Sequence, residues 1–209
     1  MTKKDEISNF QVGVFFTLLR QFCYFVIIIA EVFALSYLSS IYHEKTFAED
    51  FIVEKIQFGL LVLSTITFLY QGLTNKNYSR LVYILGGVSA FAAIRECDKF
   101  FDENLPYISW KFAYIFPLAS VVYALCDVKS LKKQLIEFLQ MPAFNMMCAV
   151  VIIVVPIAQC VGHRPFVKNV LGDKNVANVK EFFEECLETI GYTLLLLSSI
   201  ECHYNMKQR

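Results

Sequence analysis

The sequence predicts an all-α protein, a polytopic transmembrane helical bundle of about six spans, with four spans as the alternative. The 209 residues are 56% hydrophobic and only 18% charged, which is more apolar than an ordinary soluble domain. Several runs approach the roughly 20 apolar residues that cross about 30 Å of hydrocarbon. Twenty Phe and eleven Tyr residues suit a lipid-facing surface with aromatic side chains at the membrane interfaces.

We expect the six spans, in chain order, at residues 14–42, 56–73, 78–101, 110–126, 142–161 and 179–204. The first run follows Lys3 and Lys4, as a signal sequence would. Its length, the presence of Glu31 and the lack of a small-residue cleavage site favour a retained anchor instead. The second run begins after charged residues and ends at the turn-like residues 74–77.

The later runs carry signals of their own. Gly86 and Gly87 in the third run would allow a neighbouring helix to approach closely. The fourth run begins at Trp110, a residue typical of a membrane interface, and the fifth has Pro156 near its end. The sixth opens with several acidic residues. Four spans result if the second and fourth runs are re-entrant or merged.

No repeat or linker divides residues 1–209, so we predict a single transmembrane domain with one short amphipathic segment at residues 127–140. The apolar positions at helical spacing in this segment are Val128, Leu131, Leu135 and Phe138. Its lysines are Lys129, Lys132 and Lys133. This pattern predicts a short helix at the membrane interface, or a continuation of the fourth span along the membrane surface. Its lysines would form a partner or lipid surface.

Composition and motifs exclude several kinds of chemistry. Formal net charge is zero, so we expect no direct nucleic-acid binding. None of the seven Cys residues forms a CxxC pair, and the three His residues lie in different regions. Nucleophile, phosphate-loop and dinucleotide motifs are absent from the sequence. We therefore expect no catalytic residues, no metal and no cofactor.

Orientation depends on the distribution of basic residues. With six spans, nine Lys and Arg residues fall on the side of the termini and eight on the other. The positive-inside rule is thus nearly balanced. We expect a multi-pass protein of the bacterial inner membrane with both termini in the cytoplasm.

Charged residues occur where a membrane-spanning chain should have few, and such residues are usually paired, hydrated or functional. Six alternating spans bring the end of the third and the start of the sixth to one membrane face. We therefore predict one polar network there, with Arg95 as the cation that holds two carboxylates. Its members are Arg95, Glu96, Asp98, Asp102, Glu184, Glu185 and Glu188.

Three interpretations of this network stay open. A structural lock between helices is favoured, because interfacial ion pairs commonly join helix ends. An ion path, ligand pocket or trigger comes second. A catalytic metal site comes third, because such sites usually require several His ligands.

Glu31 is a separate candidate, because it falls near the middle of the first span. A carboxyl group there must be neutral and hydrogen-bonded, or face water or a base. We weigh a structural role for Glu31 above ion conduction.

Two short motifs resemble known proteins. Residues 94–102 (IRECDKFFD) and 184–191 (EECLETIG) are similar to an R-E-x-D motif and an E-E-x-L-E motif of small bacterial polytopic membrane proteins of unassigned function. The resemblance covers about twenty residues. It implies that the two clusters act as one site.

The chain also resembles the KwaA membrane-subunit family of the Kiwa anti-phage defence system in size, residue usage and small polytopic design. This resemblance implies an oligomeric inner-membrane sensor that works with a cytoplasmic DNA-binding partner, KwaB.

The sequence therefore favours a non-enzymatic sensor or assembly subunit in the lipid bilayer. Such a subunit would form a homo-oligomer and signal to a cytoplasmic protein partner, with anti-phage defence as one setting. The alternative is a proton or cation channel or transporter subunit that uses Glu31 and the acidic layer.

Overall fold

In the computed structural model, the structure describes residues 3–42, 47, 52–98, 101, 109–171 and 176–208. These residues are almost entirely helical and contain no strand. The prediction of an all-α fold is thus confirmed. The chain forms two compact units, Met1–Ile41 and Tyr42–Arg209.

The first unit consists of α1, Lys3–Tyr42. At 1.5 Å per residue its 40 residues extend for roughly 60 Å, which is longer than the hydrocarbon core of a bilayer. Its apolar part, Gly13–Tyr42, has the length and hydropathy of a membrane span. Glu31 lies within this part of the helix.

The second unit contains the remaining helices. They are α2 (Ile52–Thr74), α3 (Ser79–Arg95), η2 (Trp110–Tyr114), α5 (Ile115–Leu125), α6 (Val128–Phe138), α7 (Pro142–Ile152), η3 (Ile153–Ala158), α8 (Gln159–Val161), α9 (Arg164–Leu171) and α10 (Val176–Gln208).

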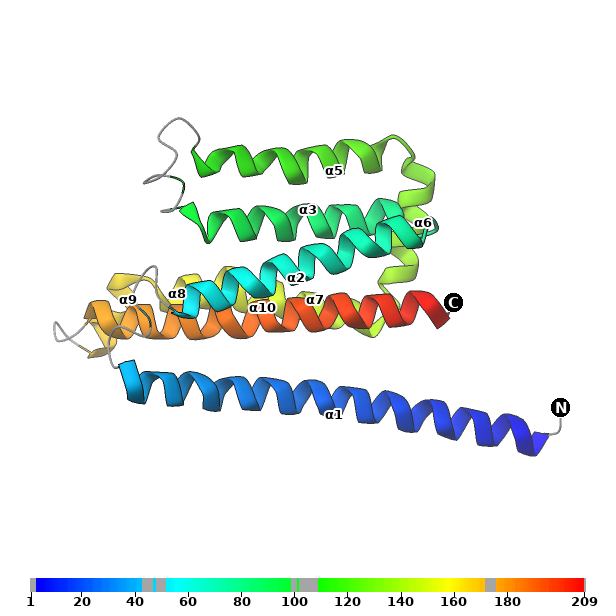
Figure 1. The fold of residues 1–209 in the computed structure, drawn as a ribbon, viewed down its shortest axis with the longest axis horizontal. Helices are drawn as coiled ribbons and strands as arrows, with labels where there is room; N and C mark the ends of the chain where they lie inside the picture. Colours follow the sequence, from blue (N-terminus) through cyan, green and yellow to red (C-terminus); the bar gives the residue numbers. More distant parts are fainter. Residues whose placement is uncertain are drawn as a thin grey trace. The chain divides into compact units, whose positions relative to one another are not determined.

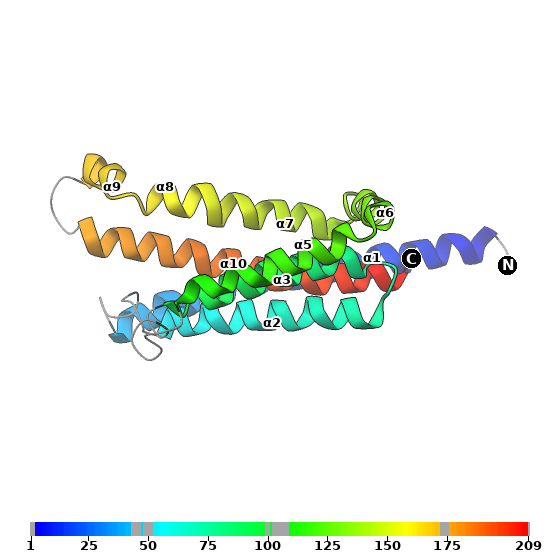
Figure 2. The same cartoon turned by 90° about the horizontal axis from the view of Figure 1, so that it is seen from above.

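Within this unit, α2 lies between α3 and α10, while α5 packs on the far side of α3 and α7 packs along α10 (Figures 1 and 2). The short helix α6 crosses one end of these helices, near the C-terminus (Figure 1). The turn after α8, the helix α9 and the start of α10 lie at the opposite end. The unit therefore has two distinct ends, which are called the α6 end and the α9 end below.

A buried apolar core holds these helices together. Leu61 and Phe68 of α2 pack with Val82 of α3 and with Tyr192 and Leu195 of α10. Burial of such side chains contributes about 1.5–3 kcal/mol each. By contrast, many large apolar side chains on α5 and α7, such as Leu118 and Val151, are exposed, which suits contact with lipid.

Three helices of the described chain are long and apolar enough to cross a membrane: Gly13–Tyr42, Ile52–Thr74 and Pro142–Val161. Residues 110–138 add a fourth if α5 and α6 together form one broken span, although the two helices bend by 107° at the break. The predicted third and sixth spans fall at α3, which has 17 residues, and at α10, whose first half is acidic. Six crossings therefore remain a prediction.

The predicted interfacial segment lies at α6, and its apolar pattern does not indicate which residues are buried in the bundle. Gln134 and Phe138 are its buried residues, whereas Val128 and Leu135 are exposed. Gln134 Oε1 accepts a hydrogen bond of 2.9 Å from the backbone N–H of Leu81, which satisfies a free donor in the first turn of α3. Gln134 therefore faces inward because a backbone N–H in the first turn of α3 needs a hydrogen-bond acceptor.

Candidate functional site

A polar cavity of about 570 Å³ opens at the α9 end, between the end of α3, the start of α10 and the beginning of α2. Seven acids line it, against two basic residues, so the site is strongly negative. Its lining residues are Glu54, Arg95, Glu96, Asp98, Trp110, Gln159, Lys180, Glu181, Glu184, Glu185 and Glu188.

Helical spacing explains how α10 presents so many acids to one cavity. Glu181, Glu184, Glu185 and Glu188 follow an i, i+3, i+4, i+7 pattern, which places their side chains on one face of the helix. Like charges on one stripe repel each other, so the face requires compensating cations or hydrogen-bond donors.

Arg95 supplies this compensation from the last residue of α3. Its Nη2 donates to Glu96 Oε1 at 3.0 Å and lies 3.6 Å from Glu188 Oε1 on α10. The carboxylates are 9% and 5% exposed, whereas the Arg95 side chain is 42% exposed. One half-exposed guanidinium thus serves two buried carboxylates from different helices.

Tyr192 forms a second polar link between the same helices. Its hydroxyl on α10 donates to Glu96 Oε1 of α3 at 2.7 Å. Glu96 therefore receives two donors, Arg95 and Tyr192. Arg95 and Glu96, at the end of α3, thus contact α10 at two positions one helical turn apart, Glu188 and Tyr192.

Gln57 connects α2 to the acidic face of α10. Its Nε2 donates to Glu185 Oε2 at 2.8 Å and to Thr189 Oγ1 at 3.0 Å. Gln57 and Thr189 are fully buried, so these hydrogen bonds lie in a low-dielectric environment where they are strong. Glu185 is thereby fixed between α2 and α10.

The turn after α8 closes another side of the cavity. Glu184 Oε2 forms an ion pair of 3.1 Å with Lys180. A Cβ atom at Gly162 would lie 2.6 Å from the Glu184 carboxylate, so the turn lies directly against this acid. Gln159 Nε2 donates to Glu188 Oε1 from the same segment, at 3.4 Å.

Buried polar side chains continue along α10 from the cavity towards the α6 end. Thr189 is followed by further buried members of this row, which are Thr193, Ser198, Ser199 and Glu201. Gln71 Nε2 of α2 donates to the Ser199 carbonyl at 2.8 Å, and Asn205 Nδ2 donates to Glu201 Oε1 at 2.8 Å. The interface between α2 and α10 therefore carries buried polar contacts at Gln57 and Gln71, beside the apolar core.

The structure brings most of the predicted network together in this cavity. The predicted residues that line it are Arg95, Glu96, Asp98, Glu184, Glu185 and Glu188. Glu31 belongs to α1 in the other compact unit, and Asp102 lies outside the described residues. The predicted lysines lie on α6, at the α6 end, and all three are exposed.

Sequence reasoning missed Gln57, Gln159 and Tyr192, because each lies in or beside an apolar run as a single polar residue. For Tyr192 a signal was present: it lies four residues after Glu188, on the acidic face of α10. Gln57 carries no such signal, since only the packing of α2 on α10 brings it to Glu185.

The described residues contain no group of three or more His, Cys, Asp and Glu side chains arranged to hold a metal ion. The acids instead bond to Arg95, Lys180, Gln57 and Tyr192. The acidic side chains of this cavity can attract cations and can exchange one ion-pair partner for another.

Together, the apolar helices and the polar cavity at one end of the bundle indicate a polytopic helical membrane protein. No family model matches the chain, and no curated protein or solved structure matches it.

Proposed function

We propose that this protein is a non-enzymatic membrane sensor subunit, in which a cationic solute or a proton at the acidic cavity alters the ion pairs between α3 and α10. The observation that carries the proposal is the position of Arg95. It bridges Glu96 and Glu188 at the edge of a cavity in which acids outnumber bases. A cation that enters the cavity competes with Arg95 for the same carboxylates.

The energetics support a switch. The Arg95 side chain is 42% exposed, so water reaches its guanidinium and partly screens its ion pairs. The two carboxylates are more deeply buried, so some cation or proton must accompany them. Exchange of Arg95 for another cation therefore requires little free energy and changes a contact between helices.

The helix α10 offers a route from the cavity to the other membrane face. Its 33 residues form one continuous helix, about 50 Å long at 1.5 Å per residue. Glu188 lies in its first half, at the cavity, and Glu201 and Asn205 lie near its C-terminal end. A shift of such a rigid element at the cavity is transmitted to its C-terminal end.

The distribution of charge supports an orientation with the α6 end in the cytoplasm. This end carries Lys76, Arg80, Lys129, Lys132 and Lys133, whereas acids dominate the cavity. Basic residues prefer the cytoplasmic side. The proposal thus places the cavity outside the cytoplasm and a docking surface for a cytoplasmic protein on α6 and the C-terminal turn of α10.

The proposal extends to a homo-oligomer in a bacterial inner membrane. The apolar residues exposed on α5 and α7 would contact lipid or a second copy. The resemblance to the Kiwa membrane subunits supports a role in anti-phage defence.

Hydrogen exchange of the full chain in detergent, with and without the polycation spermidine, tests the proposal. We expect spermidine to change exchange at residues 181–190 and also at 200–208. Glu188→Gln should abolish both responses, while Glu137→Gln, which neutralises an acid on α6, should keep them. A response confined to the cavity would contradict transmission through α10, and no response at either segment would contradict cation sensing.

A second candidate function is a proton or cation path, and the polar row along α10 favours it. Among the described residues, Gln57 Oε1 and Gln71 Oε1 are buried side-chain acceptors without a hydrogen-bond donor. Both face the row that begins at Glu185 and ends at Glu201. Buried acceptors along such a row are suited to carry a proton through water or side chains.

Ion flux in proteoliposomes separates the two candidates. A conducting protein should acidify liposomes under a pH gradient, and Glu185→Gln or Glu31→Gln should abolish that flux. Flux that is lost in Glu31→Gln would contradict the sensor proposal. If the protein carries no ion flux in proteoliposomes and its hydrogen-exchange response to spermidine is kept, the ion path is contradicted.

A further inference from the structure

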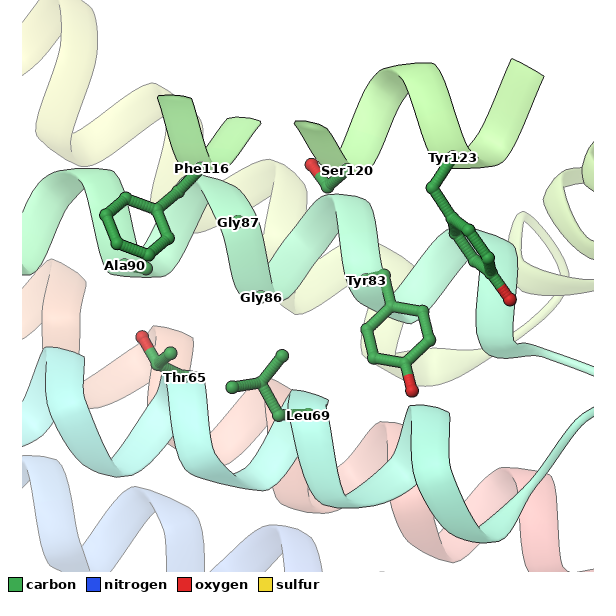
Figure 3. A pocket seen from close by; sticks show the side chains of 9 residues that line it. All are labelled: Thr65, Leu69, Tyr83, Gly86, Gly87, Ala90, Phe116, Ser120 and Tyr123. Atoms are coloured by element: carbon green, nitrogen blue, oxygen red, sulfur yellow. The ribbon is translucent and has the colours of Figure 1, made fainter. Parts of the chain in front are cut away.

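A second cavity, of about 460 Å³, lies between α2, α3 and α5 (Figure 3). Its volume is within the range of small-molecule sites, roughly 300–1,000 Å³. It is lined by Thr65, Leu69, Tyr83, Gly86, Gly87, Ala90, Phe116, Ser120 and Tyr123. It shares no lining residue with the acidic cavity.

The interior of this cavity is apolar. The hydroxyl groups of Thr65 and Ser120 donate to carbonyls of their own helices, Leu61 and Pro117, at 2.8 Å each. They therefore offer methyl and methylene surface to an occupant, as Leu69, Ala90 and Phe116 do (Figure 3).

Glycines make this hollow possible. A Cβ atom at Gly87 would lie 2.9 Å from the Phe116 carbonyl oxygen, so α5 can approach α3 only because residue 87 has no side chain. A Cβ atom at Gly72 would lie 2.7 Å from the Tyr83 ring. The Tyr83 ring therefore packs against α2 at Gly72 and borders the cavity at the end nearer to α6.

The side chain of Arg80 lies beside this end of the cavity. The Arg80 guanidinium lies 4.1 Å from the centre of the Tyr123 ring, and the Tyr123 ring meets the Tyr83 ring edge-on at 5.4 Å. Arg80 Nη1 also donates to the Tyr123 carbonyl. Arg80 thus adjoins Tyr123, one residue of the cavity wall.

In the described part of the chain, no carboxylate lies within ion-pair distance of Arg80. A guanidinium has five N–H donors, and the Tyr123 carbonyl takes one direction only. The remaining donors are available to a planar or tetrahedral anion, and Arg binds phosphate in this bidentate manner.

We infer that this cavity is a binding site for an anionic glycerophospholipid. One acyl chain lies along α2, α3 and α5, and the headgroup phosphate lies on Arg80. An apolar hollow beside a cation matches an amphipathic anion, whereas a zwitterionic lipid would bring its choline ammonium towards Arg80, a like charge. The exposed lysines of α6 at the same end extend the positive surface that an anionic headgroup meets.

Native mass spectrometry of the delipidated full chain in detergent tests this site. The probes are phosphatidylglycerol, phosphatidylcholine with the same chains, and glycerol phosphate. We expect one phosphatidylglycerol per chain at low lipid concentration, held about tenfold more tightly than phosphatidylcholine. Both headgroups carry the phosphate, but the choline ammonium of phosphatidylcholine is repelled by Arg80 and by the lysines of α6. Glycerol phosphate should bind far more weakly, because it lacks the acyl chain.

Two pairs of variants locate the lipid. Arg80→Gln should remove the preference for phosphatidylglycerol, and Lys76→Gln, the same charge change at the same end, should keep it. Ala90→Phe fills the hollow and should weaken both lipids, while Val88→Phe, on an exposed position of the same helix, should leave both unchanged.

Equal binding of the two phospholipids by the unaltered chain would overturn the inference, and this comparison needs no variant to fold. Equal loss in Lys76→Gln and Arg80→Gln would overturn the assignment to Arg80. Glycerol phosphate bound as tightly as the lipid would show an anion site without a chain site. If Ala90→Phe alters the oligomeric state and not lipid binding, a second copy of the chain occupies the hollow instead.

Discussion

At the scale of single residues, the charged side chains differ in what supports them. Glu188 is 5% exposed and depends on a cation from another helix, whereas Lys133 is 79% exposed and pairs with Glu137 at 3.9 Å along its own helix. The first is a tertiary contact in a partly dehydrated environment, and the second is a surface pair worth about 0.3–0.5 kcal/mol.

Arg95→Gln should therefore lower the free energy of unfolding by about 1–3 kcal/mol, because Glu188 and Glu96 are left buried without their cation. Glu188→Gln in addition should restore part of this loss, with a coupling of about 1 kcal/mol. Thermal unfolding in detergent, followed by circular dichroism, measures both. Lys133→Gln is the control and should change stability by less than about 0.5 kcal/mol; equal effects of Arg95→Gln and Lys133→Gln would contradict a buried pair.

At the scale of helices, the contact between α10 and η3 depends on a glycine. The segment η3 is a π-helical turn that contains Pro156, and proline removes a backbone donor from a helix. A widened turn accommodates that loss. A Cβ atom at Gly191 would overlap Val154 Cγ2, so α10 reaches this turn only where it has no side chain.

Gly191→Ala should destabilise the protein by about 1–3 kcal/mol, the cost of inserting a methyl group into a filled interface. Gly59→Ala is the matched control in α2, because nothing lies within 4 Å of a Cβ atom there. That change should stabilise the helix by up to about 1 kcal/mol. The midpoints of thermal unfolding decide the matter: a Gly191→Ala midpoint at or above that of the parent would show that the interface relaxes.

At the scale of the whole molecule, the second compact unit separates charge between its ends. Acids line the cavity at the α9 end, and lysines are exposed on α6 at the other end. The nearly balanced count of basic residues in the sequence hides this separation, because it ignores the acids and the direction of each side chain.

The proposed orientation has a direct test. In inside-out membrane vesicles, trypsin should cleave after Lys132 or Lys133, whereas in spheroplasts these bonds should be protected. Lys168 of α9, at the opposite end, should show the reverse pattern. Mass spectrometry of the fragments identifies the cleavage sites in each preparation. Cleavage of α6 in spheroplasts would show that the orientation is the opposite of the one proposed.

Helix formation was predictable because it depends on local runs of residues. The apolar runs at residues 56–73 and 142–161 correspond closely to Ile52–Thr74 and Pro142–Val161, since hydropathy over twenty residues is a property of the chain itself. The amphipathic pattern of 127–140 was a poorer guide to burial. It indicated Val128 and Leu135 as an apolar face towards the membrane interface, and it gave no sign that α6 turns Gln134 inward to meet the first turn of α3.

By itself, the sequence determined that this is an all-α chain with helices apolar enough to cross a membrane, and which of its residues carry charge. The tertiary structure alone decided which of those charges meet. Arg95 and Glu188 are distant in the sequence, and only the packing of α3 and α10 around α2 brings them to 3.6 Å. Gln57, Tyr192 and Arg80 acquire their surroundings in the same way, because burial and pairing depend on the neighbours that packing supplies.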